Sequence, residues 1–464
     1  MEESSSASAS FDDTIVAVAT PPGQGALGTL RLSGPEALAL LGERCVPRIG
    51  SDGSGAEYFR ARPRRAAYCS CLDEDGREID EGVAIYYPGP SSYTGEDVAE
   101  ITLHGNPLLL RRMALSLTSS PGVRFAEGGE FTRRAFQNGK MDLTQAEAVR
   151  RLIEARGEYE LQAGRELYRG ALSREVSRFR SGLLHLKAET EAEVDFSEED
   201  LTFEGMAERR ARVMDLLDRI ADILRRSEST SRLTSGFQAA LVGAPNAGKS
   251  SLLNLMLGWE RAIVSAVPGT TRDFVAEEIH IGGVAVRIVD TAGLRETFDE
   301  VEREGVRRSR EQIESSGLIL HVIDGSEPPE PGSEPGDPAR TLRVINKKDI
   351  LHELFAASSE EPNTVFISCK TGEGLDRLRE KIEKILFADQ TARDPLLLED
   401  RHRFHFLRIR EALEKTLELW DRGAPHEIVA LEINRALEHT GSITGEITVE
   451  EVLGRIFSMF CVGK

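Results

Sequence analysis

The sequence of 464 residues contains no run of about 18 consecutive apolar residues, so it predicts no membrane-spanning helix and no membrane partner. Its first ten residues, Met1–Ser10, are acidic and rich in serine and lack an apolar core. They therefore fit neither a secretory signal nor an Arg-rich transit peptide, and we interpret them as a short disordered tail. The length predicts about three domains.

Cysteine is also scarce. The five cysteines are an odd number without paired spacing, which indicates a reducing cytosol and a cytoplasmic protein rather than a disulfide framework. Cys69 and Cys71 alternate as residues on a strand would. No second Cys/His pair accompanies them, so we do not expect a structural zinc site.

Positive charge is in deficit, because 58 Lys and Arg against 78 Asp and Glu give a formal net charge of −20. This balance argues against a broad, non-specific nucleic-acid surface but leaves room for a local basic patch. A solvated helix face is at least as good an interpretation of the densest basic group. That group consists of Arg401, His402, Arg403, His405, Arg408 and Arg410.

The most informative segment, Gly243–Ser250, reads G-A-P-N-A-G-K-S and fits the phosphate-binding pattern G-x-x-x-x-G-K-[ST]. Its glycines let the backbone turn tightly and point N–H groups at an anion. Lys249 offers a charge for the β- and γ-phosphates, and the Ser250 hydroxyl is a Mg²⁺ ligand. Apolar residues 237–242 before the loop and 251–257 after it predict the strand and helix that such a loop joins.

A second motif identifies the base. Asn346-Lys347-Lys348-Asp349 ends a predicted strand, as N-K-x-D does in GTPases. The Asp349 carboxylate can accept from both N1–H and the 2-amino group of guanine, whereas adenine offers neither donor. Ser368-Cys369-Lys370 follows another predicted strand and resembles the S-A-K loop behind the base. The motifs therefore predict a site for GTP and exclude a plain ATPase.

Two further segments complete the nucleotide motifs. Asp290–Gly293 reads D-T-A-G, with Asp290 near Mg²⁺ and the Gly293 N–H near the γ-phosphate. Residues 268–273 are the switch I candidate, in which Thr271 offers a second Mg²⁺ ligand. Leu294 stands where Ras-like GTPases carry the glutamine that orients water. Because leucine cannot do this, we expect the Asn246 side chain to coordinate a monovalent cation in place of an arginine finger.

Hydrophobic patterning divides the chain. Residues 1–125 contain short apolar alternations punctuated by glycine and proline, which predict an α+β domain. Residues 126–232 have a helical period. One amphipathic helix is marked by i, i+3, i+4, i+7 spacing in Val213, Leu216, Leu217, Ile220, Ile223 and Leu224.

Strands and helices alternate between residues 233 and 386, as in a doubly wound sheet. The predicted strands are 237–242, 276–281, 284–290, 318–324, 342–346 and 365–368. Gly282-Gly283 predicts a hairpin turn between two of them. Residues 387–464 are helical again, so we expect the α/β unit to be inserted in a helical domain whose two halves flank it.

Together with other segments, these motifs make the chain resemble, over nearly its whole length, the tRNA uridine modification GTPases usually called MnmE or TrmE. The most specific is E-F-T-x-R-A-F-x-N-G-K-x-D-L-x-Q-A-E-A-V at 130–149. Residues 460–464 read F-C-V-G-K against the family's F-C-I-G-K, and T-P-P-G at 20–23 and G-E-D-V-x-E at 95–100 also match. Asn106 in H-G-N and Pro268 in switch I depart from the family pattern. We expect Cys461 to be buried among aromatic residues.

The resemblance implies a fold with an N-terminal α+β domain that binds a tetrahydrofolate derivative (the 5-formyl or 5,10-methylene form) and dimerises. It also implies a helical domain and an inserted Ras-like P-loop GTPase domain. The folate residues would be Arg31, Glu100, Lys140 and Lys464. The nucleotide residues would be Gly243, Asn246, Ala247, Gly248, Lys249, Ser250, Ser251, Thr270, Thr271, Asp290, Gly293, Asn346, Lys347, Asp349, Ser368 and Lys370.

The resemblance also implies a mechanism. Potassium would be held by Asn246 and by the backbone around Ser265, Val267 and Thr270, and Glu302 would orient the attacking water through a second water. Asn246, Lys249 and Glu302 would thus be the catalytic residues. Two G domains would meet in a homodimer, which implies at least two copies of the chain.

Members of the family build a carboxymethylaminomethyl group on C5 of the wobble uridine of certain tRNAs, together with a flavin-binding partner. A heterotetramer with that partner is therefore expected. The alternative from another class is a GTP-dependent ribosome-assembly or RNA-binding factor without modification chemistry. The segments at 130–149 and 460–464 favour the modification enzyme.

Overall fold

The computed structural model describes residues 12–48, 54–195, 205–259, 277–290, 316–328, 337–355, 361–447 and 450–464. The chain divides into two compact units, Met1–Arg150 with Gly441–Lys464 and Arg151–Thr440. No helix within the described ranges is long and apolar enough to cross a membrane. The predicted tail Met1–Ser10 lies outside the described residues.

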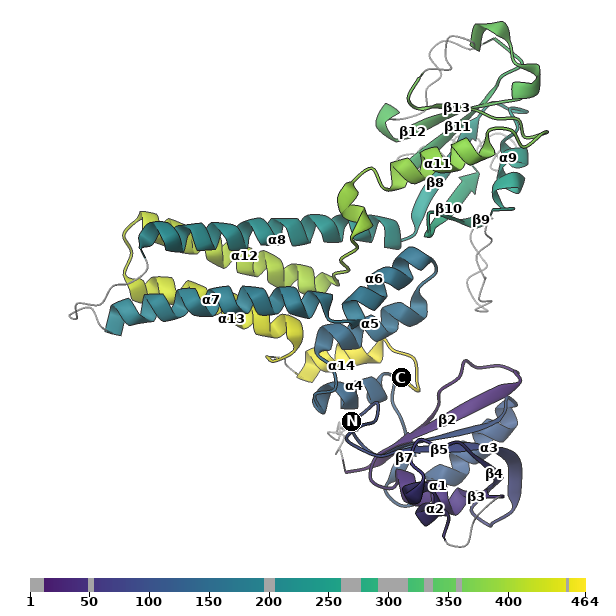
Figure 1. Ribbon diagram of the computed structural model, residues 1–464, viewed down its shortest axis with the longest axis vertical. Coiled ribbons are helices and arrows are strands. Elements are labelled where there is room, and N and C mark those ends of the chain that lie inside the picture. Colours follow the sequence, from purple (N-terminus) through teal and green to yellow (C-terminus); the bar gives the residue numbers. More distant parts are fainter. Residues whose placement is uncertain are drawn as a thin grey trace, which may run out of the picture. The chain divides into compact units, whose positions relative to one another are not determined.

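The first unit contains a seven-stranded sheet in the order β3-β4-β5-β6-β2-β1-β7 (Figure 1). Neighbouring strands are antiparallel except for the parallel pair β1 and β7. The strands are β1 (Thr14–Val18), β2 (Leu27–Ser33), β3 (Cys45–Pro47), β4 (Ala67–Leu72), β5 (Glu78–Tyr87), β6 (Val98–His104) and β7 (Val123–Phe125). The predicted α+β class is thus present. The short strands β3 and β7 were missed, because three residues carry too little pattern.

One face of this sheet packs against three helices, α1 (Ala37–Arg44), α2 (Gly55–Ala61) and α3 (Pro107–Thr118). Alternate residues such as Leu30 and Ile101 enter this core, so the residues between them face the other side of the sheet. Asn106, which departs from the family pattern, has an ordinary φ of −97°, and its side chain accepts a hydrogen bond from Leu108 N–H at the start of α3. It therefore acts as a helix cap.

The segment 130–149 folds as α4 (Glu130–Gln137) and the start of α5 (Leu143–Glu154). Asp142 and Gln145 form a reciprocal cap of α5, since each side chain accepts a hydrogen bond from the other's backbone N–H. The apolar face of α5 packs against α14 (Glu450–Ser458). Much of this family-specific segment therefore encodes local structure.

Arg134 is the centre of a buried ion network in the first unit. Its guanidinium is only 1% exposed and donates to the carboxylates of Asp13, Glu96 and Glu130. Glu130 also accepts from Arg124 and from Glu127 N–H. Burial opposes ionisation of Glu130, but these donors outweigh it and hold its pKa below the usual value. The network joins α4 to segments far away in the sequence.

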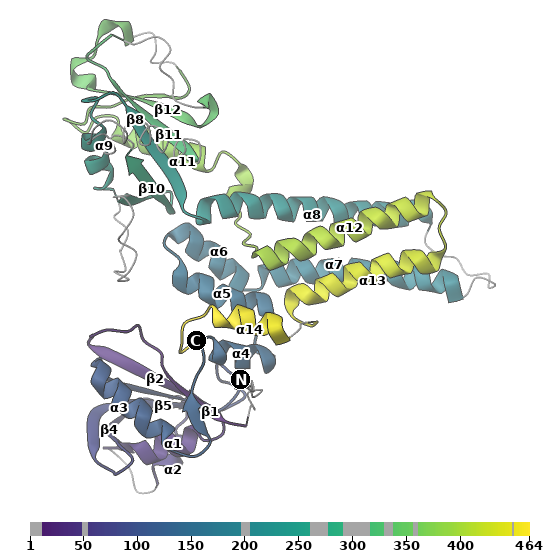
Figure 2. The ribbon, with the colours of Figure 1, turned by 180° about the vertical axis from the view of Figure 1, so that it is seen from behind.

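In the second unit, four long helices lie side by side in both Figure 1 and Figure 2. They are α7 (Ala171–Asp195), α8 (Met206–Thr234), α12 (Asp400–Asp421) and α13 (His426–Thr444), and α6 (Glu158–Tyr168) precedes them. On α8, four of the six predicted stripe residues, Val213, Leu216, Ile220 and Ile223, are buried. Helices α8 and α12, which pack together, flank the α/β segment in sequence.

The α/β segment forms a six-stranded sheet in the order β13-β12-β11-β8-β10-β9, parallel except for the hairpin strand β9. Its strands are β8 (Phe237–Gly243), β9 (Glu277–Ile281), β10 (Val284–Asp290), β11 (Leu318–Asp324), β12 (Thr341–Asn346) and β13 (Thr364–Phe366). Helices α9 (Lys249–Met256) and α11 (Leu375–Leu386) contribute to its core. All six predicted strands are confirmed, with bounds shifted by at most two residues, and so is the hairpin turn.

We predict that Arg134→Met destabilises the first unit by about 3–5 kcal/mol, because it leaves buried carboxylates without their counter-charge. Urea unfolding followed by far-UV circular dichroism measures this change. Arg111→Met on the exposed face of α3 is the matched control and should have little effect. Equal stabilities of the two variants would contradict the structural role of the network.

Candidate functional site

The phosphate loop follows β8, which has β11 on one side and β10 on the other. The strand order of the sheet reverses at β8, and ligands of such sheets bind beyond the carboxyl ends of the strands at such a point. Gly243 and Gly248 have φ angles of 151° and 98°, and Asn246 has a φ of 63°. A Cβ on Gly243 would lie 2.1 Å from the Val322 carbonyl oxygen, and one on Gly248 would lie 2.1 Å from Asn346 Nδ2. Both positions therefore require glycine.

The Lys249 amine lies inside this loop. Its Nζ donates to the carbonyl oxygens of Gly243 and Ala244, at 2.8 and 2.7 Å. Lys249 is the first residue of α9, so the N–H groups of the helix N-terminus are beside the amine. Ser250 and Ser251 follow in the same turn and are exposed. The arrangement places one cation, a helix N-terminus and a hydroxyl where an anion and its metal can bind.

Asn346 connects the phosphate loop to the loop after β13. Its side chain is only 3% exposed. Its Nδ2 donates to the Ala247 carbonyl at 2.9 Å, and its Oδ1 accepts from Cys369 N–H at 3.0 Å. Cys369 thus makes this contact through its backbone, which any residue offers. The Asn346 side chain therefore sets the spacing of the phosphate and base loops.

Asp349 and Ser368, which are predicted to read the base, are joined by a hydrogen bond. Ser368 Oγ donates to Asp349 Oδ1 at 2.7 Å. This hydrogen bond, with support from the charges of Lys370 and Lys347, lowers the pKa of Asp349, so the carboxylate stays ionised and accepting. Lys347 itself, with a left-handed φ of 62°, donates to Asp324. An ionised carboxylate held in place by a hydroxyl is suited to two neighbouring N–H donors.

Part of the predicted nucleotide site lies outside the described residues. This applies to Ser265, Val267, Thr270, Thr271, Gly293 and Glu302, and to Pro268 and Leu294. The backbone of Asp290 ends β10 beside Leu241 of β8, at the same edge of the sheet as the phosphate loop. The structure thus brings together the described nucleotide residues, while the switch and potassium residues stay predictions.

A second polar site lies on the helix-free face of the first unit's sheet. Arg31 on β2 is the register partner of Glu100 on β6, and its Nε and Nη2 donate to Glu100 Oε1 at 2.9 and 2.8 Å. The Arg31 guanidinium lies 5.6 and 5.9 Å from the ring centres of Tyr93 and Phe131. Tyr87 donates to the other Glu100 oxygen at 3.4 Å. The pair is therefore partly buried among aromatic rings.

Lys464 lies near this pair. Burial and the charge of Arg31 lower the pKa of Lys464, whereas Glu100 raises it. A bridge between Gly128 and Val462 holds the end of the chain in place. Lys140, the fourth predicted folate residue, donates instead to the Pro90 carbonyl at 2.9 Å, on the loop that carries Tyr93. The structure thus groups Arg31, Glu100 and Lys464 and places Lys140 on the adjoining loop.

Two expectations from the sequence are wrong. Cys461 is exposed, although the neighbouring Phe460 is buried. His402 is fully buried and accepts from Glu399 N–H, so it is not part of a basic surface. Neighbours in the sequence, aromatic for Cys461 and charged for His402, do not determine whether a side chain is buried or exposed.

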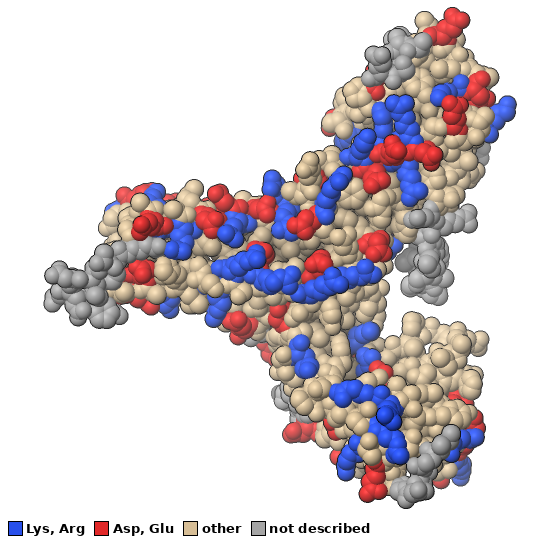
Figure 3. Space-filling model, viewed as in Figure 1, with Lys and Arg blue, Asp and Glu red and all other residues tan. Residues whose placement is uncertain are grey.

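The remaining basic group on α12 has acidic neighbours. Arg408 and Arg410 pair with Glu411 and Glu414 on the same helix. Burial lowers the pKa of His405 to about 4, so this histidine carries no charge at neutral pH. Figure 3 shows both basic (blue) and acidic (red) side chains on the helical part of the chain. The solvated-face interpretation is therefore favoured over a nucleic-acid surface.

The sequence reading missed the aromatic residues around Arg31 and the ionic role of Arg134. Tyr87 alternates with Tyr86, which enters the core on β5, so the place of Tyr87 on the opposite face of the sheet could have been derived. The i, i+4 spacing of Glu130 and Arg134 was a signal for an ion pair. The other partners, Asp13 and Glu96, are far from Arg134 in the sequence, so no local spacing indicated these ion pairs.

Two family descriptions match the chain. The "MnmE helical domain" matches residues 143–461, and the "GTP-binding protein TrmE N-terminus" matches residues 14–140. Three similar relatives are tRNA modification GTPases named MnmE. The protein of Leptospira biflexa is 43% identical and covers 97% of this chain and 100% of its own length. Those of Aquifex aeolicus and Thermus thermophilus are each 40% identical over 97% of this chain, and 100% and 99% of their own.

We predict that Asp349→Asn lowers GTP affinity at least about 30-fold, because two buried donors of guanine lose their acceptor at about 1–3 kcal/mol each. The variant should gain affinity for xanthosine triphosphate, because the C2 carbonyl of xanthine can accept a hydrogen bond from the side-chain amide that the substitution creates. Competition binding with both nucleotides measures the change. Asp376→Asn, exposed in the first turn of α11, is the control. Retained GTP affinity without xanthosine triphosphate binding would contradict guanine reading by Asp349.

Proposed function

The chain belongs to the MnmE (TrmE) family of tRNA modification GTPases, and on this premise we propose that it hydrolyses GTP in the service of tRNA modification. The observation that carries the proposal is the corner formed by Asn346, Asp349 and Ser368. It presents a rigid, ionised acceptor to the two donors that distinguish guanine from adenine. Similarity over 97% of the chain supports transfer of the family's activity.

The phosphate loop would bind the triphosphate of GTP. Lys249 would exchange its two carbonyl partners for β- and γ-phosphate oxygens, which gains charge-assisted hydrogen bonds. The exposed Ser250 hydroxyl beside it fits a Mg²⁺ ligand, and Thr271 would supply another. A bound Mg²⁺ neutralises charge that develops on the phosphates. Asn246 and Lys249 would act at the reacting phosphate, and Glu302 would orient water.

Potassium is the cation we propose beside Asn246, together with the backbone around Ser265, Val267 and Thr270. Asn246 is exposed and its left-handed φ turns the loop sharply at this residue. A carboxamide oxygen is a suitable hard ligand for such a cation. Leu294 supports the proposal indirectly, because it removes the glutamine of Ras-like enzymes and leaves charge stabilisation to another group.

The first unit would hold a tetrahydrofolate derivative at Arg31, Glu100 and Lys464, with Lys140 near its tail. A carboxylate such as Glu100 can read the amide-like edge of a pterin ring, and the cations suit the anionic glutamate tail. The aromatic neighbours Tyr93 and Phe131 fit a flat ring system. When bound, the folate supplies the one-carbon unit, in the 5-formyl or 5,10-methylene form.

We further propose the arrangement implied by the family: a GTPase domain inserted in the helical domain, and two copies of the chain that meet through their G domains and N-terminal domains. The packing of α8 against α12 supports the insertion, because these helices enclose the α/β segment in sequence. A flavin-binding partner in a heterotetramer would complete a carboxymethylaminomethyl group at C5 of the wobble uridine. This assembly would work in the cytoplasm.

The proposal predicts that GTP turnover is faster in potassium than in sodium at equal ionic strength. An arginine finger accelerates such reactions by about 10³–10⁵, and the cation must supply a comparable share. Phosphate release with Mg²⁺ present measures the rate. Asn246→Ala should reduce the difference between the two salts. Equal rates of the unaltered chain in both salts would exclude the cation role and leave guanine binding untouched.

A further inference from the structure

Tyr159, in the first turn of α6, belongs to the core of the neighbouring α/β sheet. Its side chain is only 5% exposed and packs in one cluster with Leu233 and Phe237. The ring meets Phe387 edge-on at 5.7 Å, and its hydroxyl donates to the Ala392 carbonyl at 2.7 Å. Burial raises the pKa of Tyr159, so the phenol stays protonated and able to donate. One helix residue thus joins the sheet to the connection between α11 and α12.

The backbone of the same turn contacts the β9–β10 hairpin. Tyr159 N–H donates to the Gly283 carbonyl at 3.0 Å. A Cβ on Gly157 would lie 2.6 Å from that same oxygen, so the close approach depends on glycine at 157. His280 on β9 contacts the Arg156 carbonyl through Nε2 at 2.9 Å. The hairpin therefore contacts the α5–α6 turn through the Gly283 backbone at its tip and through the His280 side chain on β9.

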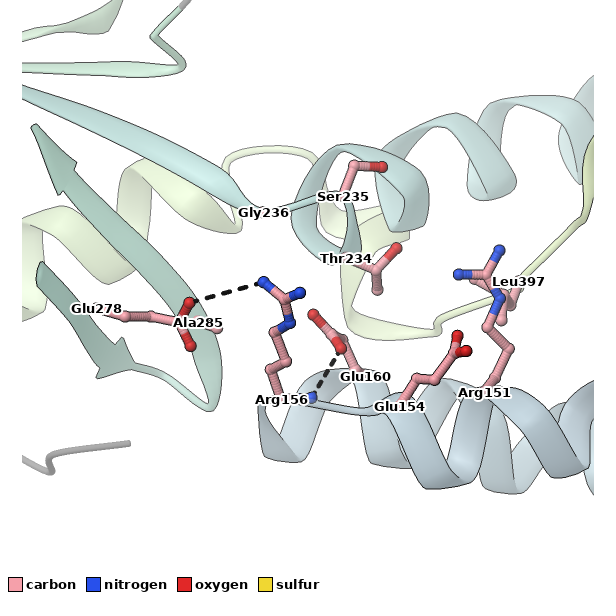
Figure 4. Close-up of a pocket in the computed structure, with 10 residues that line it drawn as sticks. All are labelled: Arg151, Glu154, Arg156, Glu160, Thr234, Ser235, Gly236, Glu278, Ala285 and Leu397. Atoms are coloured by element: carbon pink, nitrogen blue, oxygen red, sulfur yellow. Dashed lines mark hydrogen bonds and ion pairs between the residues drawn. The ribbon is translucent and has the colours of Figure 1, made fainter. Parts of the chain in front are cut away.

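Beside this contact, a polar pocket separates the hairpin from the helices. Figure 4 shows a pocket between the hairpin and the α5–α6 turn, with a volume of about 230 Å³. Across it, Arg156 and Glu278 are paired at 4.0 Å, a long and partly exposed contact of little energy. Burial raises the pKa of Glu160, which accepts from Arg156 N–H. Apart from its pairing with β8, the hairpin is thus anchored to the α5–α6 turn at Tyr159 and at the Arg156 carbonyl, while the Arg156–Glu278 ion pair across the pocket adds little.

The hairpin also connects the two segments expected to sense the γ-phosphate. Strand β9 begins at Glu277, shortly after the switch I candidate 268–273, and β10 ends at Asp290, the first residue of D-T-A-G. Strand β10 is paired from Val286 to Asp290 with β8, which leads into the phosphate loop. A change at either sensing segment would therefore act directly on a strand of this hairpin.

We propose that the β9–β10 hairpin transmits the nucleotide state to the helices by tilting about the Tyr159–Gly283 contact, with the adjacent pocket as the space into which it moves. The apolar anchor keeps the two parts joined, and the pocket allows the tilt without loss of core packing. This inference rests on the proposed GTPase function. It assigns to Gly157 and Tyr159 a positioning role remote from the nucleotide.

Hydrogen exchange of the full-length chain, with GDP or a non-hydrolysable GTP analogue bound, tests the proposal. Exchange at the Tyr159 amide, read from peptides covering 156–162, should differ several-fold between the two states. In Gly157→Ala the new methyl group displaces the Gly283 carbonyl, so this difference should disappear while affinity for both nucleotides changes less than twofold. Gly454→Ala on α14, where a Cβ meets open space, is the matched control and should behave as the unaltered chain.

Tyr159→Phe provides a second variant that keeps the ring in the core and removes only the hydroxyl bond to Ala392. It should retain the nucleotide-dependent exchange at residue 159, since the amide contact remains. Identical exchange in both nucleotide states of the unaltered chain would overturn the proposal, as would a full difference in Gly157→Ala. A chain that binds no guanine nucleotide would instead refute the proposed function. Binding and turnover without any exchange difference would refute only the coupling.

Discussion

The side chain of Asn346 is buried between the phosphate loop and the loop that follows β13. Its amide donates to Ala247 and accepts from Cys369 N–H, so two loops separated by more than a hundred residues keep one spacing. Gly248 must be glycine because this amide occupies the space a Cβ would need. The proposed anion site at Lys249 and the proposed base site at Asp349 are therefore held at a fixed distance from each other, as the binding of both ends of one nucleotide requires.

Buried polar groups have a comparable role in the first unit. Arg134 brings three carboxylates together and fixes α4 against the sheet, while Phe131 of the same helix forms one wall beside Arg31. The segment that distinguishes this family thus acts through the fold more than through direct chemistry. It positions the aromatic surroundings of the Arg31–Glu100 pair, and a glycine at 463 lets the last residue reach that pair.

Much of the fold could be predicted because its signals are local. The strands of the α/β sheet are apolar runs bounded by glycine or by motif residues, and all six appear near their expected bounds. The stripe on α8 gave a helix for the same reason. Strands β3 and β7 could not be found, since three residues show no period. Cys461 and His402 were misplaced because tertiary packing, not neighbouring residues, decides which side chain is buried.

Some residues of the candidate site could likewise be predicted from local motifs, and others could not. Loop motifs predicted a phosphate and guanine site at Gly243–Ser250, Asn346 and Asp349, because phosphate and guanine impose fixed donor and acceptor spacings, and the structure joins these loops through the Asn346 side chain. The resemblance added Arg31, Glu100 and Lys464, and the structure brings these three together. Tyr159 carried no sequence signal at all. Its importance comes from contacts with Gly283 and Ala392, each more than a hundred residues away, and only the folded chain places them side by side.

If guanine binding by this chain serves tRNA modification, the wobble uridines of the cell depend on its gene. Mass spectrometry of wobble uridines from cells that lack the gene, and from the same cells supplied with it again, measures this dependence. We expect the carboxymethylaminomethyl group to be lost without the gene and restored by its return. Unchanged wobble uridines in cells without the gene would contradict this expectation.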